Sequence, residues 1–357
     1  MLIQELLNGR PPFRQPPAGR LTVVTEALLP FVGILAFLQC EFSLTPAGTK
    51  LPVTSGYNEE WPLTVNRPKG RMAIPNKVGR FEILGELGRG PMTVDYRAND
   101  PATGRTVVLT VPSPESADSP DLLARFYREA RAAGALQHPN IVAIYDLGVD
   151  RGSPFIAREL LEGADLEQLA EREKKDGAQS PQSAATMLNY IMQACRGLAH
   201  AHQHGVIHRD VRPGTIFVTT RGIVKVTNFA LARLPHASSR SSGVLVGTID
   251  YMSPELICGD RVDGRADIWA VGCTLYEILT YATPFQGENL TSWMFAIMSQ
   301  DPKPICELRP DLPAELDAVL RRALKKDRSE RYRNMEKLLA DLELVARRLP
   351  SAAGTAP

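Results

Sequence analysis

The stretch "VKVTNFALAR" (residues 224–233) contains a pattern that could support metal chemistry. Its "VKV" run predicts a short β-strand, which ends at Asn228, Phe229 and Ala230. A carboxylate followed by a glycine at such a corner would make a metal-binding turn, because Mg²⁺ favours carboxylate oxygens. Asn228 offers only a neutral oxygen, and Ala230 lacks the backbone freedom of glycine. The corner therefore keeps the pattern of a metal site without its charge.

The composition of the 357 residues is that of a soluble globular protein, with 44% hydrophobic and 23% charged residues. A formal net charge of +1 gives no support for binding to nucleic acid through bulk charge, and we expect no nucleic-acid partner. The five cysteines contain no CxxC pair and are odd in number. This pattern predicts neither a zinc site nor a disulfide framework, and it is typical of a reduced compartment such as the cytoplasm.

An apolar run lies in the N-terminal part of the chain. Residues 27–39 (ALLPFVGILAFLQ) are apolar, but a membrane span needs about 18 residues, and Pro30 interrupts the run. A core or interfacial helix is the favoured interpretation, and membrane contact or a signal-peptide core is the alternative. Because proline-rich patches flank the run, residues 1–76 are expected to form a partly disordered extension.

The pattern changes at residue 77 to that of a folded domain. The runs "GRFEILGEL", "TVDYRAND" and "RTVVLTVPS" alternate with turn signals and predict antiparallel strands, and "IVAIYDLGV" and "PFIARELL" predict two more. Between these groups, "SPDLLARFYREARAAGAL" predicts a helix with Ser119 as its N-cap and Pro120 at its first position.

The second half of the domain is predicted to be helical. The segment 184–205 ends at Gly205, and one stripe of it carries Met187, Ile191, Ala194 and Leu198. We therefore expect an α+β fold over residues 77–348, with a mainly β lobe (77–161) and a mainly α lobe (162–348). Residues 349–357 are expected to form a C-terminal tail.

Several segments together carry a family resemblance. "ELGRGPMTVDY", "VIHRDVRPGTIFV", "NFA" and "SPE" follow one another in the order and spacing of a eukaryotic-type protein kinase domain. The sequence resembles this family over residues 78–348 and is most similar to its bacterial Ser/Thr branch. The resemblance implies a bilobal protein kinase-like fold, and transfer of the ATP γ-phosphate to a protein hydroxyl with ATP and Mg²⁺ as cofactors.

The resemblance places the nucleotide-binding positions around the first lobe. Gly88 and Gly90 match the glycine-rich loop, whose backbone amides approach phosphate. Thr93 replaces the third glycine, and Asp95 replaces the valine that covers adenine, which puts an anion near the expected nucleotide. Thr110 replaces the strand lysine that holds the α- and β-phosphates. The other cofactor-binding positions that the resemblance implies are Leu87, Glu129, Glu159, Leu161 and Phe217.

Glu129 and Arg158 raise a question of charge balance. Glu129 matches the helix glutamate that normally pairs with the strand lysine, and Arg158 stands at the usually apolar gatekeeper position. A buried guanidinium without a counter-ion would cost on the order of several kcal/mol. We therefore predict a bidentate Arg158–Glu129 pair, with Arg158 turned to solvent as the alternative. Val108, Arg158 and Phe217 would also narrow the nucleotide pocket.

The catalytic loop keeps part of the family pattern. In an active kinase of this pattern, Asp210 would accept the proton of the substrate hydroxyl. Arg212 replaces the loop lysine and keeps its charge, whereas Thr215 replaces the asparagine that binds the second metal. For His208 and Arg209, bracing of the loop through backbone hydrogen bonds is favoured over a catalytic role.

The framework positions of the helical lobe are intact. Glu255 of "SPE" and Arg331 are the pair that the resemblance predicts, and Asp267 stands in "DIWAVG". Serines in "HASSRSSG" (236–243) lie where the activation segment belongs. Phosphoserines there would be able to pair with Arg209, but solvated serines are favoured.

The substitutions decide between two functions. The triphosphate and its metals need the lysine, the asparagine and the DFG aspartate, and these places hold Thr110, Thr215 and Asn228. A charge contact at 4 Å is worth roughly 4 kcal/mol at an effective dielectric of 20, and about 1.4 kcal/mol is a tenfold change in rate. We therefore favour a cytoplasmic pseudokinase that acts in signalling through a protein partner, with no metal and no cofactor expected. The alternative is an active but atypical Ser/Thr kinase that uses ATP and Mg²⁺, with Asp210 as base and Arg158 or Arg212 as the phosphate ligand.

Overall fold

The computed structural model describes residues 75–349 apart from short gaps. These gaps are residues 91–92, 114–115, 117–122, 124–125, 127–129, 178–179 and 230–248. Nearly all of the predicted extension, with its apolar run 27–39, therefore lies outside the described residues. Within the part that is described, no helix is both long and apolar enough to cross a membrane.

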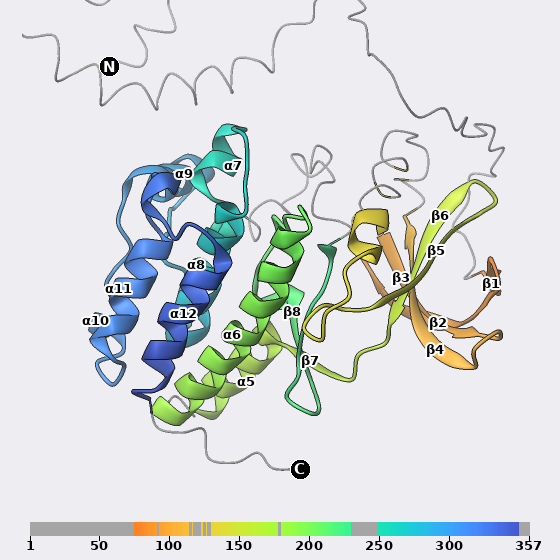
Figure 1. Cartoon of the computed structure of the whole chain (residues 1–357), viewed down its shortest axis with the longest axis horizontal. Helices are drawn as coiled ribbons and strands as arrows, with labels where there is room; N and C mark the ends of the chain where they lie inside the picture. Colours follow the sequence, from red (N-terminus) through yellow and green to blue (C-terminus); the bar gives the residue numbers. More distant parts are fainter. Residues whose placement is uncertain are drawn as a thin grey trace, which may run out of the picture. The chain divides into compact units, whose positions relative to one another are not determined.

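A six-stranded antiparallel sheet forms the first lobe, called the N-lobe below (Figure 1). Its spatial order is β1-β2-β3-β4-β6-β5. The strands are β1 (Lys77–Val78), β2 (Phe81–Arg89), β3 (Thr93–Asp100), β4 (Arg105–Pro112), β5 (Ile144–Asp150) and β6 (Ser153–Glu159). These bounds confirm the five strand runs predicted from alternation. Of the predicted helix between β4 and β5, residues 130–134 are helical, whereas its Ser119 cap lies outside the described residues.

The two faces of this sheet have different chemistry. One face carries a hydrophobic cluster built around Phe81, Tyr96, Leu109 and Phe155. Because side chains alternate along a strand, the neighbouring residues of the same strands point to the other face. That face turns toward the second lobe and carries the polar residues of the candidate site.

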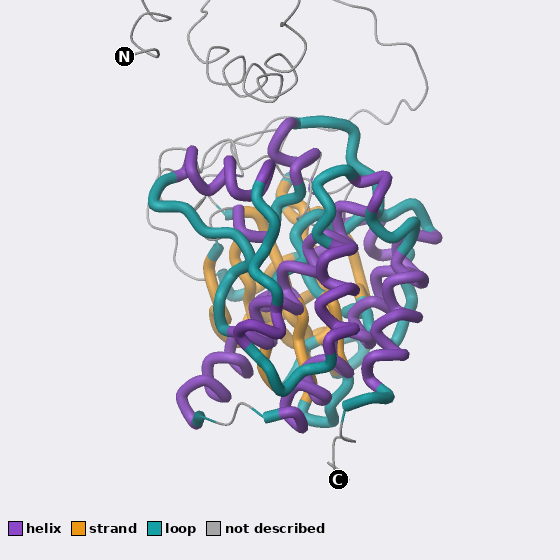
Figure 2. The backbone as a smooth tube through the Cα atoms, turned by 90° about the vertical axis from the view of Figure 1, so that its left-hand side faces the viewer, coloured by secondary structure: helices purple, strands orange, loops and turns teal. Residues whose placement is uncertain are grey.

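The second lobe, called the C-lobe, contains eight described helices and a three-stranded sheet of order β7-β8-β9 (Figures 1 and 2). The helices are α5 (Leu166–Asp176), α6 (Pro181–Gln203), α7 (Pro254–Cys258), α8 (Arg265–Thr280), α9 (Leu290–Ser299), α10 (Ile305–Leu308), α11 (Ala314–Ala323) and α12 (Met335–Ala346). The strands are β7 (Gly163–Asp165), β8 (Ile216–Thr219) and β9 (Val224–Val226). The sheet of the N-lobe and the helices of the C-lobe confirm the α+β, bilobal fold.

Helix α6 forms the centre of the C-lobe core. Its N-terminus is capped by Ser180, whose hydroxyl accepts from the backbone N–H of Ser183, so the helix begins before the predicted segment. The predicted stripe is buried along its length, at Met187, Ile191, Ala194 and Leu198. This stripe belongs to the large core that also contains residues of α8, α11 and α12.

The segment 140–142 ties the N-lobe to the C-lobe. The Asn140 carbonyl accepts from the backbone N–H of Val226 at 2.9 Å, and the Val142 N–H donates to the Val226 carbonyl at 3.0 Å. The segment can approach α6 closely because residue 197 is glycine, where a Cβ atom would lie 2.7 Å from the Asn140 carbonyl oxygen. The position of β9, which leads into Asn228, is therefore fixed from both lobes.

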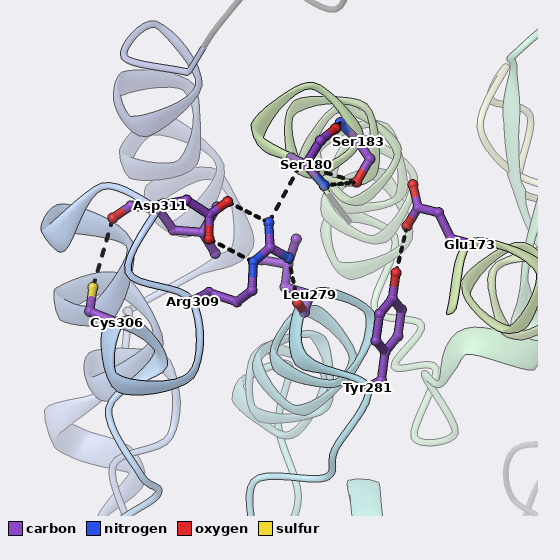
Figure 3. A network of polar contacts seen from close by, with 9 residues as sticks. Glu173, Ser180, Ser183, Leu279, Tyr281, Cys306, Arg309 and Asp311 are labelled. Atoms are coloured by element: carbon purple, nitrogen blue, oxygen red, sulfur yellow. Dashed lines mark hydrogen bonds and ion pairs between the residues drawn. The ribbon is translucent and has the colours of Figure 1, made fainter. Parts of the chain in front are cut away.

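A buried arginine ties several helix ends together within the C-lobe (Figure 3). Arg309 donates to the Leu279 carbonyl in the last turn of α8 at 2.8 Å, and to both oxygens of Asp311 at 2.8 and 2.7 Å. A longer contact of 3.4 Å reaches the carbonyl of Ser180, the N-cap of α6. Arg309 is 5% exposed, and Asp311 neutralises its buried charge.

Arg309→Met is expected to lower the free energy of unfolding by about 2–4 kcal/mol, because the methionine removes the buried hydrogen bonds from the guanidinium to the Leu279 carbonyl and to the Asp311 carboxylate. Urea denaturation measures this change. Arg321→Met is the matched control, since the Arg321 side chain is 62% exposed and its pair with Asp317 is on the surface. We expect less than about 1 kcal/mol for the control. Equal losses in the two variants would contradict the structural role of Arg309.

Candidate functional site

The candidate site lies between the cleft face of the N-lobe sheet and the C-lobe segment that follows β9. Thr110 and Arg158 from the sheet and Asn228 and Phe229 from the C-lobe line one cavity. Its other walls are apolar and come from Ala133, Ile141, Val142, Ile144 and Ile156. The cavity measures about 30 Å³, which is room for one or two water molecules and far below the roughly 300–1,000 Å³ of ligand pockets.

Three side chains on the cleft face of the sheet form one polar group. The Thr110 hydroxyl donates to Asp95 Oδ1 at 2.5 Å, and the Arg158 guanidinium donates to Asp95 Oδ2 at 2.7 Å. Arg158 Nε also lies 3.4 Å from the Thr110 hydroxyl oxygen. Strand register explains the group. Asp95 lies opposite Thr110 across β3 and β4, and Arg158 on β6 is the diagonal neighbour of Thr110. Thr110, at the position where the family has a lysine, therefore offers a neutral hydroxyl that is hydrogen-bonded to the Arg158–Asp95 ion pair.

The predicted Arg158–Glu129 pair stays untested, because Glu129 lies outside the described residues. The counter-ion of Arg158 in the structure is Asp95, which the sequence predicted only as an anion near the nucleotide. The alternative of an arginine turned fully to solvent is wrong, since the Arg158 side chain is 19% exposed.

The segment that joins the lobes is also charge-paired. Glu159 Oε2 accepts from Lys225 Nζ at 3.0 Å and from the backbone N–H of Ala143 at 3.2 Å. Phe217 lies opposite Lys225 across β8 and β9, and Leu161 is half-buried beyond the end of β6. Val108 is buried opposite Arg158.

The glycine-rich stretch forms the end of β2. Leu87 is 51% exposed, and Gly88 lies opposite Asp95 in the sheet. The Gly90 N–H donates to the Thr93 carbonyl at 2.8 Å, so this amide is already used by the turn. Asp95 therefore lies between the glycine-rich strand and the Thr110 position.

The loop around Asp210 is closed by Thr215. Thr215 is fully buried, and its hydroxyl oxygen accepts from the Arg212 N–H at 3.1 Å and lies within 3.1 Å of the carbonyls of Asp210 and Arg212. Asp210 keeps a side-chain exposure of 23%, and Arg212 Nε lies 3.6 Å from its Oδ2. The carboxylate is therefore accessible, whereas the hydroxyl at the second-metal position is used inside the loop.

Asn228 adopts a left-handed backbone conformation with φ of 66°. Asparagine tolerates this region better than most residues, so the corner keeps its turn without a glycine at this position. Phe229 is 5% exposed, and its ring meets the His208 ring edge-on at 4.5 Å. His208 Nε2 in turn hydrogen-bonds the Thr227 carbonyl at 2.7 Å. The corner is thus packed against the Asp210 loop, and Ala230 lies outside the described residues.

Asp267 holds the Asp210 loop through hydrogen bonds to the loop backbone. Its carboxylate is fully buried and accepts from the backbone N–H groups of His208 and Arg209 at 2.8 and 2.7 Å, and it pairs with His202 Nε2 at 2.6 Å. Burial alone would raise the pKa of Asp267, but these hydrogen bonds and the nearby histidines hold it below its usual value. The loop is therefore braced through its backbone.

The predicted Glu255–Arg331 pair is confirmed. Arg331 Nη1 and Nη2 donate to the two Glu255 oxygens at 2.7 and 2.8 Å, and the Arg331 side chain is 0% exposed. Burial opposes ionisation of Glu255, yet the arginine holds its pKa below the usual range. The serines of residues 236–243 lie outside the described residues.

The described residues fit an Mg²⁺–nucleotide complex poorly. A divalent cation favours carboxylates, but Asn228 is an amide and the Thr215 hydroxyl is committed to its own loop. The cation that lines the cavity, Arg158, is paired with Asp95, and the negative charge of Asp95 opposes the approach of phosphate oxygens. Among the described residues, no group of three His, Cys, Asp or Glu side chains is arranged to hold a metal ion.

A small antiparallel sheet joined to a helical lobe, with an aspartate-bearing loop facing the sheet, defines a protein kinase-like class of fold. The model of the family described as "Protein kinase domain" matches residues 81–341. The chain belongs to this family.

Named relatives support this membership. A probable serine/threonine-protein kinase of Corynebacterium efficiens is 36% identical over 78% of this chain, and serine/threonine-protein kinase PknB of Mycobacterium leprae is 37% identical over 75% of it. This chain spans less than half of the length of either relative, 43% in both cases. The crystal structure of the Mycobacterium tuberculosis PknI kinase domain matches 77% of this chain and all of that domain, with a TM-score of 0.63 and 28% identity.

The partnership of Asp95, Thr110 and Arg158 was not predicted from the sequence. A signal for the first contact was present, because the predicted strands 93–100 and 105–112 form a hairpin whose pairing places residue 95 opposite residue 110. The Lys225–Glu159 pair was not predicted either, because it depends on the approach of β9 to the end of β6.

Proposed function

We propose that this chain is a pseudokinase, a protein kinase fold that acts in signalling by binding another protein rather than by transferring phosphate. The observation that carries the proposal is the fully buried Thr215 hydroxyl at the place of the second-metal ligand. Because this oxygen is buried and hydrogen-bonded within the loop, it is not presented to the cleft as a metal ligand. Thr110 and Asn228 support the same conclusion at the lysine and first-metal positions.

The intact framework supports a binding role. Asp267 and the Glu255–Arg331 pair stabilise the structure of the C-lobe, although none of the three residues binds phosphate in the family. A retained shape with substituted phosphate positions is what a protein-binding module requires.

The rest of the assignment concerns organisation. We propose that residues 77–348 form the kinase-like domain, residues 1–76 an N-terminal extension and residues 349–357 a tail. A protein is the proposed partner, in the cytoplasm, with no nucleic acid involved. Membrane contact of residues 27–39 is not favoured.

An active but atypical Ser/Thr kinase is the second candidate. The accessible Asp210 carboxylate favours it, because this group would be able to take the proton of a protein hydroxyl. The similar chains from Corynebacterium efficiens and Mycobacterium leprae carry names of serine/threonine-protein kinases. This function would require Arg158 or Arg212 to hold phosphate in place of the absent lysine.

Phosphate transfer from radiolabelled ATP tests the two candidates. We expect the wild-type chain to transfer no more label to itself or to a generic Ser/Thr kinase substrate than Asp210→Asn does, with either Mg²⁺ or Mn²⁺. We also expect no metal-dependent thermal stabilisation by ATP. Transfer that requires Mg²⁺ and disappears in Asp210→Asn would overturn the pseudokinase proposal and establish the alternative.

A further inference from the structure

Asp95 occupies a distinctive place on the cleft face of the N-lobe. Its two sheet neighbours are Gly88 on β2 and Thr110 on β4. Both neighbours are small, so neither shields the carboxylate from the cleft. Its side chain is 31% exposed, which leaves it in contact with solvent while it holds Arg158.

Three cations of the site, among the described residues, lie beside carboxylates. Arg158 lies at 2.7 Å from Asp95, Lys225 at 3.0 Å from Glu159, and the third, Arg212, at 3.6 Å from Asp210. An incoming anion would therefore have to compete with a carboxylate of the protein at each of them. Arg158 is the one that lines the cavity next to Thr110 and Asn228.

The Arg158–Asp95 contact is of the kind that an anionic ligand would make. A guanidinium presents several N–H donors in a planar fork, which matches the oxygens of a carboxylate or a phosphate equally well. Asp95 occupies one side of this fork, and it is also held by the Thr110 hydroxyl at 2.5 Å. Two donors therefore fix the carboxylate in place without a ligand.

We propose that Asp95 is an internal competitor for anionic ligands. Because Asp95 holds Arg158, the cleft does not bind nucleotide phosphates. The inference rests on the proposed pseudokinase function and names the residue that enforces its lack of nucleotide binding. It concerns binding alone and includes no phosphate-transfer step. Removal of the Asp95 charge frees the Arg158 guanidinium for phosphate oxygens.

Asp95→Asn tests this inference, because the amide keeps the size of the side chain and its hydrogen bond from Thr110. Isothermal titration of the full chain uses ATP, tripolyphosphate and adenosine as probes, each with and without Mg²⁺. We expect Asp95→Asn to bind ATP and tripolyphosphate at least about tenfold more tightly than the wild type. Adenosine binding should not change, since adenosine carries no phosphate.

Two further variants show whether the gain depends on the freed arginine. Asp95→Asn/Arg158→Met should lose the gain, because methionine has no charge. Asp146→Asn is the matched control, since Asp146 pairs with Arg80 at another place in the N-lobe sheet. It should bind all three probes as the wild type does. Asp95→Ser is a second neutral variant, to be used if Asp95→Asn shows no cooperative unfolding.

Three results would overturn the inference. These are wild-type binding of ATP as tight as that of the neutral variants, no gain in either neutral variant, and a gain that persists without Arg158. None of them bears on whether the wild-type chain transfers phosphate, so the pseudokinase proposal is tested separately by the Asp210→Asn comparison.

Discussion

Arg331→Met is expected to lower the free energy of unfolding by about 3–5 kcal/mol, which corresponds to a fall in Tm of roughly 10 °C. Glu255 would lose both of its arginine hydrogen bonds in a site where it is 7% exposed. Thermal and urea unfolding of the full chain measure the change. A loss below about 1 kcal/mol would show that the pair contributes no more than a surface ion pair.

The pH dependence of this variant provides a second measurement. The pKa of Glu255 is lowered in the folded chain, since Arg331 outweighs the effect of burial. Its contribution is therefore present above the unfolded pKa of about 4.3 and is lost as the pH falls through the folded value. The stability difference between wild type and Arg331→Met should accordingly shrink on acidification below about pH 4. Glu255→Gln/Arg331→Met should recover part of the loss at neutral pH, because it removes the uncompensated charge.

Asp267→Asn is expected to cost about 2–4 kcal/mol, although the side chain changes by a single group. The Asp267 oxygens accept from His202, His208 and Arg209, and an amide offers only one oxygen. At least one backbone N–H of the Asp210 loop would therefore face another N–H donor. Urea unfolding measures the loss, and hydrogen exchange at the amides of His208 and Arg209 should become faster.

Asp263→Asn is the matched control for this prediction. Asp263 lies just before α8, and its carboxylate accepts from the backbone N–H of Arg265 at 2.9 Å in an exposed position. Asparagine can make the same contact, so a change within about 0.5 kcal/mol is expected. If Asp267→Asn and Asp263→Asn had the same effect, Asp267 would not be the support of the loop.

The acid dependence of Asp267 has the same sign as that of Glu255. Its folded pKa lies below the usual value even though burial opposes this, because His202 and the loop amides stabilise the charged form. Stability from this group is present above an unfolded pKa of about 3.9 and is lost as the pH falls through the folded value. The support that Asp267 gives to the Asp210 loop should therefore be lost only as the pH falls below about 3.9, which hydrogen exchange at low pH measures.

Local patterns in the sequence predicted the elements that position the site. Alternation over residues 93–100 and 105–112 predicted β3 and β4, and the apolar stripe through Met187 and Leu198 predicted the buried side of α6. These patterns succeed because a strand or helix repeats its burial over neighbouring residues. The Glu255–Arg331 pair was also predicted, but through the family resemblance, since the partners are 76 residues apart.

The sequence by itself determined which residues stand in the motifs, and the family resemblance predicts that Thr110, Thr215 and Asn228 occupy the phosphate and metal positions. Only the tertiary structure decided what these residues do. The order β3-β4-β6 brings Asp95 and Arg158, 63 residues apart, to the two sides of Thr110. The Thr215 hydroxyl is buried and hydrogen-bonds within its own loop. Such contacts depend on strand order, register and solvent exclusion, which are set by the whole chain rather than by neighbouring residues.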